Sequence, residues 1–243
     1  LASYTNVHEE NICLFNGSDH AIELLITLFY KKDEHVVLPD TTFFIYRHML
    51  SLKEVGLTSV LYVIDKEPYD INFPYEETCK LLTPEVNGLL LCNPNNPMGT
   101  PIPEDQLHDL IKRTYALNIP IIIDEAYFEF YGNTAVSYIE KYANVIVIRT
   151  FSKAFGLAGL RFGYVIAHKD IITELNKLKL PWSVSHFTSF TAVQALNEKK
   201  MFAQRRHQLL KRKQKLEEFL KKNNILFFTS KGNFLLLKVL HAD

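Results

Sequence analysis

Short apolar segments alternate with amphipathic segments along most of this chain, and that alternation limits the possible folds more than any other feature. The apolar segments are rich in Val and Ile and lie at residues 36–38, 59–63, 88–92, 120–124, 145–149 and 162–167. Short segments that are apolar throughout are typical of strands covered on both faces. We therefore predict six such strands.

The segments between these strands have the pattern of helices. Residues 18–30 carry apolar side chains at Ile22, Leu25, Ile26 and Phe29, and residues 103–117 begin with Pro-Glu-Asp, a favourable first helical turn. Strands that alternate with helices require right-handed crossovers. The sequence thus predicts an α/β fold, a three-layer α/β/α domain with a mostly parallel sheet. Ligands of such sheets bind at the carboxyl ends of the strands.

The pattern changes in the last quarter of the chain. A long basic helix is expected over 198–222, followed by strands at 225–229 and 233–239. We expect residues 1–190 to form the large domain and residues 191–243 to begin a smaller α+β domain. The pattern stops within folded-looking sequence at both ends, so we expect an amino-terminal segment and most of the small domain to be missing.

Charge and composition favour a small-molecule ligand. The 27 basic residues balance the 27 acidic ones, which favours neither nucleic acid nor an anionic membrane. The basic helix lacks an aromatic or Gly-rich readout element, so we interpret it as a solvated face. No apolar run approaches the roughly 20 residues of a spanning helix, and no signal peptide opens the chain. Three widely spaced cysteines indicate no metal site. We predict a cytoplasmic protein.

Asp124 is the first candidate site residue. It ends a strand of three isoleucines, where a buried carboxylate needs a partner. One interpretation is a helix cap. The functional one is a salt bridge to a protonated ring nitrogen, which keeps a pyridinium positive and able to accept electrons. Tyr127 could then donate a hydrogen bond to the phenolate oxygen of the same ring, although an ordinary buried tyrosine is the alternative.

Two loops supply further candidates. Residues 93–99 read Asn-Pro-Asn-Asn-Pro-Met-Gly, a rigid loop that would let Asn96 share the phenolate oxygen with Tyr127. Gly17-Ser18-Asp19 opens the helix at 18–30, and free N–H groups at a helix start suit a phosphate. Such a start is common, so alone it says little. Ser152 and Arg161 could complete the phosphate site.

Lys153 gains its meaning from these neighbours. A lone lysine is usually solvated, but an acid for a ring nitrogen, two donors for a phenolate and a phosphate site together describe pyridoxal 5′-phosphate (PLP). The sequence therefore predicts that Lys153 holds PLP as a Schiff base.

These motifs together resemble the aspartate aminotransferase superfamily, fold type I of the PLP enzymes, and within it the histidinol-phosphate aminotransferases. The shared motifs are Asn-Gly-Ser-Asp at 16–19, Asn-Asn-Pro-Met-Gly at 95–99, Asp-Glu-Ala-Tyr at 124–127 and the run from Ser152-Lys153 to Leu160-Arg161. The resemblance implies a homodimer with sites at the interface. It implies the roles given above for Lys153, Asp124, Asn96 and Tyr127. It further implies a phosphate site from Ser18, Asp19, Thr150, Ser152 and Arg161, and stacking of Phe43 on the ring.

Two departures from the family pattern concern the substrate. Lys238 occupies the position of an arginine that grips the substrate carboxylate, and a lysine is a flexible point charge instead of a planar fork. The segment Pro181-Trp182-Ser183-Val184-Ser185 is more similar to threonine-phosphate decarboxylases. We keep Trp182 and Lys238 as candidate substrate-binding residues.

Three functions remain open at this point. The first is a PLP-dependent aminotransferase that acts on histidinol phosphate or a related phosphorylated amino compound, with 2-oxoglutarate as amino acceptor. The second is a PLP-dependent decarboxylase of an amino-acid phosphate, since the same ring serves either reaction. The third is a PLP-binding regulatory domain without turnover.

Overall fold

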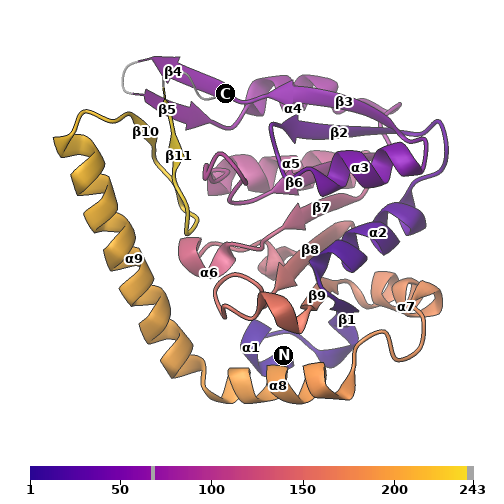
Figure 1. The fold of residues 1–243 in the computed structure, drawn as a ribbon. Coiled ribbons are helices and arrows are strands. Elements are labelled where there is room, and N and C mark those ends of the chain that lie inside the picture. The colour runs from indigo at the N-terminus through magenta and orange to yellow at the C-terminus, as the bar shows by residue number, and fades with distance from the viewer. Residues whose placement is uncertain (67–68, 240–243) are drawn as a thin grey trace.

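The computed structural model describes residues 1–66 and 69–239, and a seven-stranded sheet forms its centre (Figure 1). The order of strands across the sheet is β1-β9-β8-β7-β6-β2-β3. These strands are β1 (Ile12–Asn16), β2 (His35–Asp40), β3 (Gly56–Leu61), β6 (Gly88–Cys92), β7 (Ile121–Asp124), β8 (Val145–Thr150) and β9 (Phe162–Ala167).

The sheet is mostly parallel, as predicted. The pairs from β3 through β2, β6 and β7 to β8 are all parallel, whereas β9 is antiparallel to both of its neighbours, β8 and β1. Every residue of β6, β7, β8 and β9 is buried. Helices on both faces cause this burial, and it explains why these strands are apolar at every position.

Two apolar cores separate the three layers. Ile121 and Ile123 of β7 face one core and Ile122 faces the other, because successive side chains of a strand point to opposite faces. The core around Ile122 contains side chains of α2 (Ser18–Phe29), α3 (Ile45–Leu52) and α7 (Lys169–Leu178). Side chains of α4 (Tyr75–Leu81), α5 (Glu104–Ala116) and α8 (His186–Asn197) pack into the opposite core. The predicted α/β/α architecture is confirmed.

The long helix α9 (Lys199–Lys222) runs along one side of the molecule and leads to β10 (Phe227–Phe228) and β11 (Leu236–Leu237) (Figure 1). The helix prediction for 198–222 is confirmed within one residue. The strands predicted at 225–229 and 233–239 shorten to two residues each. The division into two domains stays a prediction.

Several elements differ from the sequence predictions. The strand predicted at 59–63 is confirmed only at residues 59–61, because β3 begins at Gly56 and ends at Leu61. Val63 begins β4 (Val63–Lys66), which pairs with β5 (Tyr69–Asn72). The chain leaves the sheet where Tyr62 turns into the core between the exposed Leu61 and Val63. The elements that were not predicted include β1, the β4–β5 pair, α3, α4, α7, α8 and the four-residue helices α1 (Ala2–Thr5) and α6 (Phe128–Tyr131). Across residues 1–66 and 69–239, no helix combines the length and apolarity needed to cross a membrane.

Candidate active site

A cavity of about 160 Å³ opens where the parallel strands β6, β7 and β8 end. All ten residues that the sequence predicts for Lys153 and its cofactor line this cavity. They are Ser18, Asp19, Phe43, Asn96, Asp124, Tyr127, Thr150, Ser152, Lys153 and Arg161. The structure thus brings together residues from several separate stretches of the sequence, at the sheet edge where ligands of parallel sheets bind.

Asp124 lies at the floor of the cavity, at the end of β7. Its side chain is 3 % exposed, and its Oδ1 accepts a hydrogen bond of 2.8 Å from the N–H of Ala126. Its Oδ2 accepts one of 2.5 Å from the hydroxyl of Tyr46. Burial raises the pKa of Asp124, and these donors and the charge of Lys153 only partly oppose that effect. Within the described part of the chain, Asp124 has no basic side chain within 4 Å.

This arrangement fits a cationic ring nitrogen. A buried carboxylate that lacks a counter-charge is unfavourable, and a protonated pyridine beside it would supply one. The alternative prediction, that Asp124 caps the turn that follows it, also agrees in part with the structure. The Oδ1 of Asp124 accepts a hydrogen bond from the N–H two residues later. One oxygen of Asp124 therefore holds the turn after β7, and the other is held by Tyr46 of α3.

Asn96 and Tyr127 meet across the cavity. The Nδ2 of Asn96 donates to the hydroxyl of Tyr127 over 3.4 Å, so both groups can reach one ligand oxygen. The Nζ of Lys153 lies 5.5 Å from the centre of the Tyr127 ring. Two hydrogen bonds fix the loop that carries Asn96. The N–H of Asn93 donates to the carbonyl of Asp124, and the Oδ1 of Asn95 accepts from the N–H of Met98.

The other end of the cavity suits an anion. Ser18 and Asp19 form the first turn of α2, where backbone N–H groups lack intrahelical acceptors. A Cβ at Gly163 would lie 2.5 Å from the backbone N of Ser18, so only glycine lets this turn sit directly on β9. The Nη2 of Arg161 donates to Asp19 over 2.7 Å. The carboxylate of Asp19 therefore pairs with the guanidinium of Arg161. The group that Asp19 can offer to an anion is its backbone N–H, because its side chain is negatively charged.

Thr150 and Ser152 complete this end. The Oγ1 of Thr150 donates to the Oγ of Ser152 over 2.9 Å and accepts from its N–H over 3.1 Å. This local turn follows β8 directly and orients Lys153 as the next residue. Hydroxyl, amide and guanidinium donors thus surround one end of the cavity, while Asp124 lies at its floor.

Sequence reasoning missed three contributors to the site. Tyr46 holds Asp124 and makes an edge-to-face contact with Phe43 at 6.2 Å; the spacing of three residues between these aromatics was the available signal. Cys92 lines the cavity, and burial raises the pKa of its thiol. Phe234 lies in the segment between β10 and β11, which the sequence assigned to another domain. The centres of the Phe234 and Tyr127 rings are 5.1 Å apart.

The two substrate candidates lie outside the cavity. Trp182 is 91 % exposed and follows α7, and Lys238 is exposed just after β11, with its N–H bonded to the carbonyl of Leu226. Neither lines the cavity. Their roles stay predictions.

Comparisons with known proteins agree with this geometry. The family model described as aminotransferase class I and II matches residues 1–243. A histidinol-phosphate aminotransferase of Thermoanaerobacter sp. (strain X514) is 35 % identical over 244 residues, which cover 100 % of this chain and 67 % of that protein. The chain therefore spans about two thirds of the length of that relative.

Solved structures show the same fold. The histidinol-phosphate aminotransferase from Clostridium acetobutylicum matches with a TM-score of 0.87 and 27 % identity, over 99 % of this chain and 71 % of that one. The histidinol-phosphate aminotransferase from Sinorhizobium meliloti, solved in complex with pyridoxal-5′-phosphate, matches with a TM-score of 0.86 and 22 % identity, over 97 % of this chain and 64 % of that one. The L-threonine-O-3-phosphate decarboxylase from Porphyromonas gingivalis matches with a TM-score of 0.80 and 21 % identity, over 98 % of this chain and 69 % of that one.

Proposed function

This chain belongs to the aminotransferase class I and II family and is a PLP-dependent aminotransferase, and from that premise we propose that it transfers the amino group of histidinol phosphate, or of a related phosphorylated amine, to 2-oxoglutarate. The observation that carries the proposal is Asp124, a buried carboxylate without a cationic partner among the described residues, on the floor of a cavity that Lys153 also lines. The homodimer expected from the family resemblance is part of the proposal, and light scattering of the purified protein tests it.

Each cavity residue has one task in this proposal. PLP, when bound, supplies an electron-accepting ring that takes up the electron pair released when a bond to the substrate Cα breaks. Asp124 would hold the ring nitrogen in its protonated form. Asn96 and Tyr127 donate hydrogen bonds to the ring oxygen, which their 3.4 Å separation supports. Phe43, which lines the cavity just before α3, would pack against the ring.

Lys153 is the residue that would hold PLP covalently. With its Nζ free, it would serve as the base that takes the proton from the substrate Cα and as the acid that returns a proton to the product. The turn from Thr150 to Ser152 fixes the backbone on one side of Lys153. Phe155 fixes it on the other, because its ring stacks on Phe151 at 4.2 Å. The base is therefore presented by a rigid loop.

The phosphate of the cofactor is assigned to the opposite end of the cavity. The first-turn N–H groups of α2, the hydroxyls of Thr150 and Ser152, and the guanidinium of Arg161 offer donors of fixed direction there. The ion pair between Arg161 and Asp19 keeps the guanidinium at this position. Holding the phosphate orients the ring, so that Asp124 and Lys153 act on defined atoms.

A half-reaction tests the proposal. Purified full-length protein loaded with PLP is mixed with L-histidinol phosphate alone, and the absorbance of the bound cofactor is followed. We expect the absorbance to change with the donor and to recover when 2-oxoglutarate is added. Lys153→Arg keeps the charge but cannot form the Schiff base, so this variant should show no such cycle.

Two other outcomes would favour the alternatives. Release of CO₂ from O-phospho-L-threonine without amino transfer would indicate a decarboxylase. The exposed position of Trp182 gives that reading no support from geometry. A stable PLP complex that responds to no amine donor would indicate a regulatory domain.

A further inference from the structure

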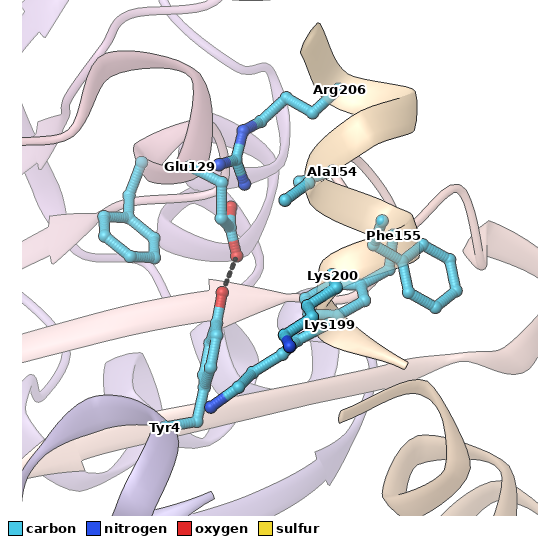
Figure 2. Close-up of a pocket in the computed structure, with 10 residues that line it drawn as sticks. Tyr4, Glu129, Ala154, Phe155, Lys199, Lys200 and Arg206 are labelled. Carbon is cyan, nitrogen blue, oxygen red and sulfur yellow. Dashed lines mark hydrogen bonds between the residues drawn. The ribbon is translucent and has the colours of Figure 1, made fainter. Parts of the chain in front are cut away.

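A second cavity, of about 340 Å³, lies next to the chain segments that carry Lys153 and Tyr127. Figure 2 shows residues that line it. Lys153 lines the first cavity, whereas the next two residues, Ala154 and Phe155, line the second. Likewise, Tyr127 lines the first cavity and Glu129 lines the second. The remaining walls come from α1 and the first two turns of α9. The two cavities share no lining residue, and this volume lies within the range that holds small ligands, roughly 300–1,000 Å³.

Aromatic rings form the apolar part of this second cavity. The Phe155 ring lies 5.1 Å from the ring of Phe202 and 6.0 Å from that of Tyr4, in tilted and edge-to-face contacts. Phe155 is buried and stacked on Phe151, so its ring is held firmly. Phe128 adds a fourth ring to the lining. Rings arranged in this way pack best against another flat ring.

Three cations lie at the cavity, all from the start of α9. They are Lys199, Lys200 and Arg206, and among residues 1–66 and 69–239 none forms an ion pair within 4 Å. Figure 2 shows both lysines extending toward Tyr4 and Arg206 pointing toward Glu129. The positive end of the α9 dipole adds to these charges. The cavity therefore favours an anion.

Glu129 is the acidic residue of the lining, and its protonation sets the net charge of the cavity. Its Oε1 accepts a hydrogen bond of 3.2 Å from the hydroxyl of Tyr4. Burial raises the pKa of Glu129 to about 7, although Arg149 and Arg206 act in the opposite direction. As the pH falls through about 7, Glu129 becomes protonated, and the charges of the cations are then no longer opposed within the lining.

We propose that this cavity binds a small aromatic carboxylate, with its ring against Tyr4, Phe155 and Phe202 and its carboxylate on the cations of α9. A single planar guanidinium matches a planar carboxylate in a bidentate pair. The lining of this site contains none of the residues assigned to PLP, although its Phe155 also packs on Phe151 in the loop that presents Lys153.

Binding at this site is linked to protonation of Glu129. The protonated carboxyl can donate a hydrogen bond to the ligand, whereas the ionised form repels it, so affinity falls as the pH rises through about 7. The other titratable groups facing Glu129 are the Tyr4 and Tyr164 hydroxyls, the Arg149 and Arg206 guanidiniums and the Lys199 and Lys200 amines. Burial raises the pKa of both tyrosines, so neither ionises near neutral pH.

Calorimetric titration of 2-naphthoate into the full-length holoenzyme tests the proposal, with uncharged 2-naphthamide as the matched ligand. Borohydride reduction of the Schiff base beforehand keeps the first cavity occupied. We expect 2-naphthoate to bind once per chain at pH 6 and at least about tenfold more tightly than the amide. Arg206→Gln should weaken 2-naphthoate about tenfold. Arg212→Gln, on the same helix but outside the cavity, should not.

Two further variants locate the site. Ala203→Trp fills the cavity and should abolish binding, while Glu129→Gln should remove the loss of affinity between pH 6 and pH 8. Circular dichroism checks that both variants fold. The proposal is overturned if 2-naphthoate does not bind, if acid and amide bind equally, or if Arg206→Gln leaves the affinity unchanged.

Discussion

The hydroxyl of Tyr46 donates a hydrogen bond of 2.5 Å to the Oδ2 of Asp124, and both side chains are buried. Tyr46 belongs to α3 and Asp124 ends β7, so the contact joins a helix to the floor of the cavity. The N–H of Ala126 holds the other carboxylate oxygen. Together these donors fix the orientation of the acid toward the cavity.

Tyr46→Phe should lower both the stability of the apoprotein and its affinity for PLP. It removes a donor from a buried carboxylate, which costs roughly 1.5–3 kcal/mol of unfolding free energy where Asp124 is ionised. We also expect the pKa of Asp124 to rise further and PLP affinity to fall several-fold. Urea unfolding of the apoprotein and fluorescence titration with PLP measure the two effects.

Tyr30→Phe is the matched control for Tyr46→Phe. The Tyr30 hydroxyl is buried and has no hydrogen-bond partner among the described residues. Its removal should be nearly neutral for stability and leave PLP affinity unchanged. Equal effects of the two substitutions would contradict the role given to Tyr46.

Asp124→Asn should make the apoprotein more stable at pH 8. Burial raises the pKa of Asp124 in the folded state above that in the unfolded chain, so its contribution to stability is lost as the pH rises through the folded pKa. Removing the charge should therefore stabilise the folded apoprotein at pH 8, and the difference should shrink toward pH 4. Thermal unfolding at both pH values measures this, and a less stable variant at pH 8 would contradict it. PLP affinity should nevertheless fall.

Gly17→Ala should damage the anion end of the cavity. Gly17 has φ +82°, and a Cβ there would lie 2.3 Å from the Nη2 of Arg161, so the guanidinium would have to move away from Asp19. We expect PLP affinity to fall at least about tenfold and stability by about 1 kcal/mol or more. Gly159→Ala is the control in the same region, since a Cβ there meets nothing within 4 Å. Similar losses of PLP affinity in both variants would argue against the Arg161 site.

Arg149→Met should cost about 3–5 kcal/mol of unfolding free energy. Arg149 and Glu125 form a buried ion pair of 2.9 Å beneath the segment that carries Tyr127, and the Arg149 guanidinium lies 3.5 Å from the centre of the Phe128 ring. The single substitution leaves the Glu125 charge buried without its partner. In the double variant Glu125→Gln/Arg149→Met, much of that loss should return, and urea denaturation of the three variants tests the coupling. Additive losses would contradict it.

The sequence by itself predicted the layered fold, most of the parallel strands, and Lys153 with nine residues that the structure places around the same cavity. The strands and most of these residues could be predicted because their signals are local, whereas Phe43 and Thr150 were predicted only from the family resemblance. An apolar run marks a strand covered on both faces, and polar side chains at the ends of neighbouring parallel strands must meet at one sheet edge. The assignment of Asp124 rested on three preceding isoleucines, and its burial follows from them directly.

Only the tertiary structure decided which groups act on those residues from other elements. Tyr46 reaches Asp124 because α3 packs on the sheet, Phe234 reaches Tyr127 from beyond α9, and Glu129 meets Tyr4 across 125 residues. Nothing in the local pattern at these positions encodes a distant partner, since hydrogen bonds and ring contacts depend on how helices dock on the sheet. The raised pKa of Glu129 and the second cavity beside Lys153 arise from that docking.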